Sequence, residues 1–312
     1  MSISANKTPR LAVLLPCYNE ATTVAQVVSS YRELLPDASV YVYDNNSTDD
    51  TAATAAAAGA VVIPEYRQGK GFVIRSMFRD IDADIYLLCD GDNTYEAKDV
   101  VALAQDVLDG RADMVIGDRL SSTYFTENTR AFHNTGNRFV RWLINTIFKA
   151  EIKDVMTGAR AFSRRFVKTY PSLIEGFEIE TEMTIHALDK DFLITQHPVA
   201  YNDRPAGSTS KLNTIPDGLR VIKTIFALFK DFRPLLFFGL VSALLFVLAI
   251  ILFLIPLEEF LSTGLVTRFP TLIVSVSVGI MALLSGACGI IIDSIRKQTR
   301  TFFELELNRI SS

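Results

Sequence analysis

The stretch Leu87–Glu96, LLCDGDNTYE, ends an apolar run in two carboxylates one residue apart, Asp90 and Asp92. Residues i and i+2 of an extended chain point the same way, and Gly91 between them lets the backbone turn tightly or approach a ligand. Two like charges this close repel each other unless a cation binds beside them. Mg²⁺ or Mn²⁺ is typically held by one or two carboxylates plus substrate phosphates. We therefore expect a divalent metal ion at Asp90 and Asp92; the alternative is a solvated turn.

Four more polar clusters occur in the first 120 residues, at 16–20, 44–49, 67–71 and 118–119. Asp44 in the second cluster could accept hydrogen bonds from a base or a ribose, while Ser47 offers an N-cap for the helix that follows. The run Gly69-Lys70-Gly71 could bring backbone close to a diphosphate, with the lysine as a point charge. Each cluster by itself is weak evidence for a ligand-binding site, so its position in the fold decides whether it supports one.

The chain around these clusters alternates between short apolar runs and segments with helical spacing. The apolar runs are 11–15, 39–43, 60–63, 85–89 and 113–117. This order predicts an α/β fold with a Rossmann-like, mostly parallel sheet covered by helices on both faces. Every polar cluster follows the carboxyl end of a predicted strand, and open α/β sheets bind ligands at that edge. We therefore expect the five clusters to meet in one crevice.

The bulk composition limits the class of protein. Hydrophobic residues make up 49% of the chain, which prompts a search for membrane segments. The net charge of −4 implies no general attraction to nucleic acid. Three cysteines, far apart in the sequence, do not make a disulfide framework or a thiolate metal site.

Two runs without any charge, 234–256 and 270–292, are long enough to cross a membrane. About 23 residues at about 1.5 Å each give roughly 34 Å of helix, and a hydrocarbon core is about 30 Å thick. Buried core helices are the alternative, but core helices of this length normally keep a polar stripe. Small residues in the second run are typical of close helix packing and favour a homo-oligomer.

Basic residues flank the two runs unevenly. The connection at 257–269 holds one, Arg268, whereas the flanking segments hold Arg220, Lys223, Lys230, Arg233, Arg296, Lys297 and Arg300. The positive-inside rule therefore places both termini in the cytoplasm. The predicted organisation is a cytoplasmic domain at 1–212, an amphipathic juxtamembrane helix at 213–233, a transmembrane hairpin at 234–292 and a cytoplasmic tail at 293–312. The juxtamembrane helix would lie in the headgroup layer or pack on the soluble domain.

The motifs LPCYNE, DNNSTDDT, GKG, DGDNTYE and GDR, in that order, resemble those of the family 2 glycosyltransferases. Two later stretches, DVMTGARAFSRR (154–165) and DRPAGSTSKL (203–212), are similar to those of the dolichyl- or polyprenyl-phosphate sugar synthases. The C-terminal hairpin is similar to that of the subgroup with two transmembrane helices. Many of these synthases have a glutamine where this chain has Thr94, which leaves the donor sugar open.

The clusters and the resemblance together imply roles for individual residues. Those expected to bind the nucleotide sugar, often a uridine compound, are Pro16, Tyr18, Glu20, Asp44, Asn46, Lys70, Asp90, Gly91 and Arg119. Those expected at the catalytic centre are Asp92, Asp154, Arg160, Arg204 and Lys211. The cofactor would be Mg²⁺ or Mn²⁺, held by Asp90 and Asp92.

An anionic acceptor fits a run of basic residues between 130 and 168: Arg130, Arg138, Arg141, Lys149, Lys153, Arg160, Arg164, Arg165 and Lys168. The alternative for this run is an ordinary solvated surface. The residues expected to contact the acceptor phosphate are Arg138, Arg160, Ser210 and Lys211. A lipid phosphate has a second pKa of about 6, so it is largely ionised at neutral pH and needs no strong general base.

The sequence thus predicts an inverting glycosyltransferase that moves one sugar, such as UDP-linked glucose or N-acetylglucosamine, to a polyprenyl phosphate such as undecaprenyl phosphate. The reaction would occur at the cytoplasmic face of the membrane and serve cell-envelope glycan modification. A transferase with a hydroxyl acceptor in polysaccharide synthesis is an alternative, with Asp154 or Glu180 as base. A non-catalytic, membrane-tethered nucleotide-sugar binder is another.

Overall fold

The computed structural model describes residues 9–121, 131–171, 179–202 and 229–311. The chain divides into two compact units. The first comprises Met1–Asp217 with Glu306–Ser312, and the second comprises Gly218–Leu305. The boundary at residue 217 lies close to the end of the predicted cytoplasmic domain at residue 212.

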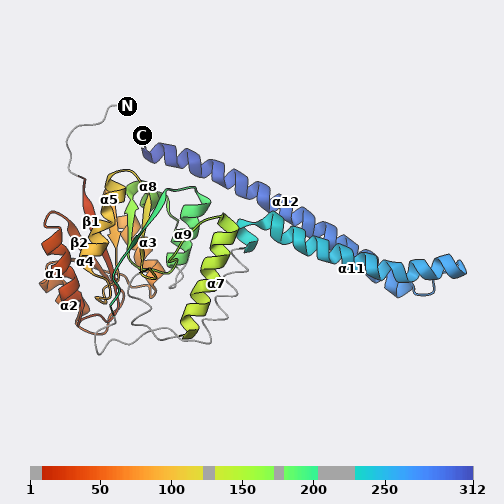
Figure 1. Ribbon diagram of the computed structural model, residues 1–312, viewed down its shortest axis with the longest axis horizontal. Coiled ribbons are helices and arrows are strands. Elements are labelled where there is room, and N and C mark those ends of the chain that lie inside the picture. Colours follow the sequence, from red (N-terminus) through yellow and green to blue (C-terminus); the bar gives the residue numbers. More distant parts are fainter. Residues whose placement is uncertain (1–8, 122–130, 172–178, 203–228, 312) are drawn as a thin grey trace. The chain divides into compact units, whose positions relative to one another are not determined.

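The first unit contains a seven-stranded sheet with the order β3-β2-β1-β4-β6-β5-β7 (Figure 1). The strands are β1 (Leu11–Cys17), β2 (Ser39–Asp44), β3 (Val61–Pro64), β4 (Ile85–Leu88), β5 (Met114–Asp118), β6 (Arg160–Ser163) and β7 (Ile194–Pro198). Only β6 runs antiparallel to its neighbours β4 and β5. The mostly parallel sheet and its first five strands are therefore confirmed, whereas β6 and β7 were not predicted.

Helices cover both faces of the sheet, as the alternating pattern predicted. They are α1 (Val24–Leu34), α2 (Thr51–Ala57), α3 (Lys70–Asp80), α4 (Ala97–Ala102), α5 (Ala104–Leu108), α7 (Ala131–Phe148), α8 (Arg164–Thr169) and α9 (Ile179–Asp189). The apolar strands β4 and β5 are buried along their whole length, which is expected for strands covered on both sides. Phe162 of β6 packs edge-to-face with Phe78 of α3 and stacks on Phe166 of α8.

One local prediction is wrong. Ser47 does not cap α2; the residue before this helix is Asp50, and it makes no side-chain capping bond. The Ser47 hydroxyl instead accepts a hydrogen bond from the backbone N–H of Asn19 (2.9 Å). Ser47 therefore joins the loop after β2 to the loop after β1.

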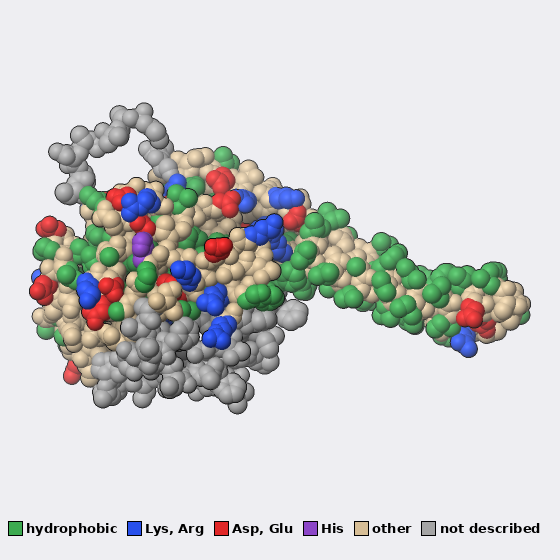
Figure 2. Space-filling model, in the orientation of Figure 1, with side chains coloured by type: hydrophobic (Ala, Val, Ile, Leu, Met, Phe, Trp, Pro, Cys, Tyr) green, Lys and Arg blue, Asp and Glu red, His purple; other side chains and the backbone are tan. Residues whose placement is uncertain are grey.

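The second unit contains a long apolar helix, α11 (Pro234–Thr263), and most of a second one, α12 (Phe269–Ser311), whose residues from Glu306 on belong to the first unit. Both are long and apolar enough to cross a membrane. Each helix is longer than the predicted apolar run. Helix α11 continues through Pro256 and ends at Gly264, whose φ of 74° suits a glycine. Hydrophobic side chains gather along the outside of this pair (Figure 2).

Small residues let α11 and α12 approach each other. A Cβ on Gly289 would lie 2.9 Å from the Cβ of Phe238, and one on Gly286 would lie 3.3 Å from the Ser242 hydroxyl. The Ser285 hydroxyl also donates to the carbonyl of Phe238 (3.1 Å). These small residues are used within one chain, so they no longer favour a homo-oligomer, which stays a prediction.

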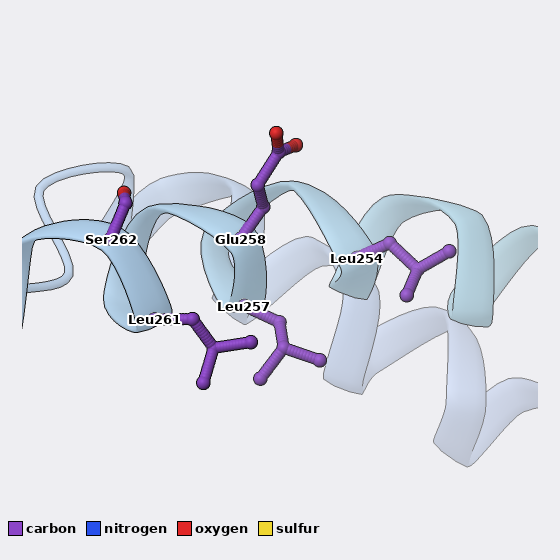
Figure 3. Close-up of a pocket in the computed structure, with 5 residues that line it drawn as sticks. All are labelled: Leu254, Leu257, Glu258, Leu261 and Ser262. Atoms are coloured by element: carbon purple, nitrogen blue, oxygen red, sulfur yellow. The ribbon is translucent and has the colours of Figure 1, made fainter.

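A shallow hollow lies on α11 near its C-terminal end (Figure 3). Its lining residues, all from this one helix, are Leu254, Leu257, Glu258, Leu261 and Ser262. The hollow therefore includes no residue of the sheet.

Candidate active site

The five polar clusters follow β1, β2, β3, β4 and β5, which all run in the same direction, and so they meet at one edge of the sheet. Hydrogen bonds join the loops. The N–H of Asn45 donates to the carbonyl of Cys17 (2.9 Å), and the N–H of Gly69 donates to Asn45 Oδ1 (2.8 Å). The Thr23 hydroxyl donates to the carbonyl of Gly91 (2.8 Å). The loops form one connected rim.

Sharp turns after β1, β2 and β4 each use an asparagine in the left-handed region: Asn19, Asn46 and Asn93, with φ of 54°, 58° and 58°. Asparagine tolerates this conformation better than most residues. The Asn46 amide donates to the carbonyl of Tyr66 (2.7 Å). The Asn46 side chain thus holds the neighbouring loop, and its contact with a nucleotide stays a prediction.

The ends of β1 and β2 lie side by side, with Cys17 opposite Asp44 in the sheet. Asp44 Oδ1 is buried, and it has no hydrogen-bond partner among the residues that the structure describes. A buried acceptor without a donor is costly, so this oxygen is suited to a ligand N–H or O–H. Pro16 and Tyr18 are half-buried beside it, and Glu20 is buried. This corner has the polarity expected for a base or ribose.

Lys70, the first residue of α3, lies between two carboxylates. Its Nζ is 2.6 Å from Asp90 Oδ1 and 2.5 Å from Glu180 Oε1. The side chains of Lys70 and Glu180 are 11% and 6% exposed, and that of Asp90 is 29% exposed. Burial acts to lower the pKa of Lys70, but the two ion pairs outweigh it and raise this pKa. Lys70 therefore stays charged beside the predicted diphosphate site.

Asp92 is 3% exposed, and its Oδ1 accepts hydrogen bonds from the N–H and hydroxyl of Thr94 (3.2 and 2.7 Å). Thr94, which stands where many of the similar synthases have a glutamine, thus orients the Asp92 carboxylate. Glycines make room around the motif. A Cβ on Gly91 would lie 2.4 Å from Cys17 Sγ, and one on Gly158 would contact Asp90 Oδ2.

The two carboxylates fit a divalent cation, because both provide hard oxygen ligands at the ligand-binding edge. In the described part of the chain, no three Asp, Glu, His or Cys side chains form a complete cation site. A metal ion held by Asp90 and Asp92 would take its remaining ligands from the donor diphosphate and water, which is the usual arrangement for Mg²⁺.

Arg119, which follows β5, forms a two-point ion pair with Asp154. Its Nε and Nη2 lie 2.8 and 3.1 Å from Asp154 Oδ2 and Oδ1. Asp154 is fully buried, and the Arg119 guanidinium also lies 5.3 Å from the centre of the Tyr201 ring. Tyr201 pairs in turn with Tyr95, next to the metal motif, through an isolated bridge. These contacts connect the motif with the segment that leads to 203–212.

Arg160 is fully buried, which does not favour the predicted contact with a sugar or phosphate. Its guanidinium donates to the carbonyls of Val155 (2.7 Å) and Thr157 (3.0 Å) and to the Thr184 hydroxyl (2.9 Å). Burial lowers the pKa of Arg160 to about 10. Arg160 instead holds the loop that follows Asp154.

Other basic residues of the 130–168 run also serve the fold. Arg164 and Arg165 pair with Asp82 and Asp113 at 3.0 and 2.5 Å, and Lys168 donates to carbonyls at the end of α3. Arg138 is exposed on α7. The predicted residues outside the described part of the chain are Arg130, Arg204, Ser210 and Lys211, with most of the juxtamembrane helix at 213–233.

The prediction missed three side chains at this edge. Glu180 was named only as a possible general base for a hydroxyl acceptor, and Tyr95 was not assigned. Asp118 ends β5, and its buried Oδ2 has no hydrogen-bond partner among the described residues. Its place next to Arg119 at the end of a strand was a usable signal, whereas nothing local marks Glu180 as the partner of Lys70.

Comparison with known proteins gives consistent results. The family model described as "Glycosyl transferase family 2" matches residues 12–170. Glycosyltransferase AglJ of Haloferax volcanii is 35% identical over 74% of this chain and 76% of its own length. The low-salt glycan biosynthesis hexosyltransferase Agl6 of the same organism is 30% identical over 72% of this chain and 54% of its own.

The fold also matches that of glucosyl-3-phosphoglycerate synthase from Mycobacterium tuberculosis. A structure of that enzyme with Mn²⁺, UDP-glucose and phosphoglyceric acid superposes with a TM-score of 0.56 at 23% identity. The match covers 72% of this chain and 79% of that one. With a family model over half of the sequence and relatives of this similarity, the chain belongs to glycosyl transferase family 2.

Proposed function

We propose that the protein transfers one sugar from a nucleotide sugar, such as UDP-glucose or UDP-N-acetylglucosamine, to a polyprenyl phosphate at the cytoplasmic face of the membrane. The observation that carries this proposal is the group formed by Asp90, Asp92 and Lys70 at the ligand-binding edge, in a chain with two helices of membrane-spanning length. A diphosphate, a divalent metal and a lipid acceptor suit these features.

In the reaction, a phosphate oxygen of the acceptor forms a bond to the anomeric carbon while the bond from that carbon to the diphosphate breaks. The nucleoside diphosphate leaves, and one displacement inverts the anomeric centre. When bound, Mg²⁺ or Mn²⁺ would neutralise the charge that builds on the leaving group. Asp90 and Asp92 would hold the ion, Lys70 would add a second positive charge, and Asp44 would orient the base or ribose.

The ion pairs at the edge support a phosphate acceptor over a hydroxyl acceptor. A hydroxyl needs a general base within reach, and the two candidates were Asp154 and Glu180. Asp154 is fully buried and paired with Arg119, and Glu180 is buried and paired with Lys70. An ionised phosphate attacks without such a base.

The test uses the purified full-length chain with labelled nucleotide sugars, Mg²⁺ or Mn²⁺, and undecaprenyl phosphate. Label should enter the organic phase with one donor, and undecaprenol, which lacks the phosphate, should not replace the acceptor. Asp92→Asn is the matched inactive variant. Label transfer to undecaprenol or to a polysaccharide would favour the hydroxyl-acceptor alternative. Donor binding without any product would favour the non-catalytic one.

A further inference from the structure

Four basic residues on and after α7 form no ion pair with a described carboxylate. Arg160, Arg164, Arg165 and Lys168 are bound by protein groups, as described above. In contrast, no ion-pair partner occurs among the described residues for Arg138, Arg141, Lys149 and Lys153. The one acidic residue between positions 138 and 153 is Glu151. The charge on this helix is therefore available to a partner.

These charges flank an exposed tryptophan on one side of the helix. Val140, Ile144 and Ile147 are buried against the protein. The exposed side chains at positions i, i+4 and i+8 form the opposite side of the helix: Arg138, Trp142 and Thr146. Exposed Lys149 follows directly after the last residue of α7, Phe148. Trp142 is 59% exposed. Figure 2 shows Lys and Arg side chains over the region of α7. We call these four side chains the outer face of α7.

An exposed tryptophan between cations is typical of a helix that lies in a membrane interface, where the ring sits at headgroup level. Anionic headgroups attract nearby Lys and Arg, and the attraction extends over about one Debye length. The two apolar helices α11 and α12 keep the rest of the chain near a bilayer once they are inserted. We propose that the outer face of α7 binds the surface of a membrane that contains anionic lipids, with Trp142 among the headgroups.

The helix is also joined to the candidate active site. Asn145 exchanges two hydrogen bonds with Ile152 (2.9 and 3.0 Å), and Arg141 donates to the carbonyl of Lys153 (3.1 Å). Asp154 comes next in the chain. If the proposed function holds, this contact brings the Asp154 loop to the membrane surface, where a lipid phosphate is found.

The chain has one tryptophan, so its fluorescence reports on Trp142 alone. The full-length protein is placed in nanodiscs of phosphatidylcholine with or without phosphatidylglycerol. Lipids brominated near the headgroup should quench the emission more than lipids brominated near the chain end. Phosphatidylglycerol should increase this quenching, shift the emission to shorter wavelength and reduce quenching by aqueous acrylamide. The experiment requires no sugar donor, so its result does not depend on the proposed activity.

Two variants make the test specific. Arg138→Gln/Lys149→Gln should need more phosphatidylglycerol for the same quenching, since each charge near the surface is worth about fivefold in affinity. Trp142→Phe/Leu34→Trp moves the reporter to α1, which lies far from α7 in the first unit (Figure 1), and this reporter should remain open to acrylamide. The proposal is overturned if acrylamide reaches Trp142 freely and brominated lipids do not quench it. It is also overturned if Trp142 is shielded equally without lipid, as a protein partner would shield it.

Discussion

The two ion pairs of Lys70 allow a quantitative test of the site's electrostatics. Lys70→Met keeps an unbranched apolar stem but removes the charge that lies 2.6 Å from Asp90 and 2.5 Å from Glu180. Glu180, whose side chain is 6% exposed, then has no ion-pair partner among the described residues. An ionised carboxylate left in that position is unfavourable, so we predict a clear loss of stability.

Removing one partner of a buried ion pair costs about 3–5 kcal/mol. Because water reaches Asp90, which is 29% exposed, we expect the lower end, about 3 kcal/mol. For a unit of this size, that lowers the Tm by about 6–12 °C. Glu180→Gln leaves Asp90 with Lys70 and should cost about 1–2 kcal/mol. The double variant removes both charges, so it should cost about 2 kcal/mol less than the sum of the two single variants.

The measurement is thermal unfolding of the full-length protein in detergent at one fixed scan rate, with each variant and the double variant compared side by side. Lys98→Met is the control, because Lys98 is 71% exposed and lies 4.0 Å from Glu96. A surface pair of this kind contributes at most about 1 kcal/mol. If Lys70→Met behaves like Lys98→Met, or if the two single effects add up in the double variant, the buried three-residue ion cluster does not form.

Three further outcomes are expected. Gly158→Ala should push away the Asp90 carboxylate that its Cβ would contact, and so weaken Mn²⁺-dependent donor binding about tenfold or more in calorimetry; Gly239→Ala, in open space, should not. EDTA should abolish binding of UDP to the wild type, and retained binding would contradict the metal site. Burial lowers the pKa of His186 to about 4 from its ordinary 6.5. Between these two pKa values, the imidazole takes up a proton in the unfolded chain but not in the folded protein. The unfolding free energy therefore falls as the pH falls through this range, by up to about 1.4 kcal/mol per pH unit. His186→Phe should remove this part of the acid sensitivity in thermal unfolding.

The sequence was sufficient for the first five strands, because buried strands such as 85–88 are continuous apolar runs bounded by polar turns. The strands β6 and β7 gave no such signal. β6 has four residues and begins with a charged one, Arg160. β7 lies at the edge of the sheet and has the half-polar sequence ITQHP, which no apolar run marks. Strands this short or polar are defined by their neighbours rather than by their own composition.

The sequence predicted the position of the site in the fold, but it did not predict which side chains contact each other there. Parallel strand direction alone brings the polar clusters to one edge, and their order in the sequence gives that direction. Ion pairs between side chains could not be predicted in this way, because Lys70 and Glu180 are 110 positions apart and either could have faced solvent. Arg160 shows the opposite case. Its motif resembles that of a ligand-binding arginine, but β6 runs antiparallel and the side chain is directed into the packed layer beneath α9, where Thr184 accepts its hydrogen bond.

The balance of charge at this edge explains why a metal ion belongs to the proposed reaction. Setting aside the Arg67–Glu65 pair and Arg160, which is fully buried and donates to protein carbonyls and a hydroxyl, two described cations lie at this edge, Lys70 and Arg119. They face more carboxylates than they can balance: Glu20, Asp44, Asp90, Asp92, Asp118, Asp154 and Glu180. Both cations already form ion pairs with these carboxylates. A diphosphate would therefore approach an excess of negative charge, and at about 4 Å each like-charge pair costs about 4 kcal/mol near a protein surface. A divalent cation on Asp90 and Asp92 would neutralise these two carboxylates beside the diphosphate, and Arg204 and Lys211 stay predicted to contact the second anion, the acceptor phosphate.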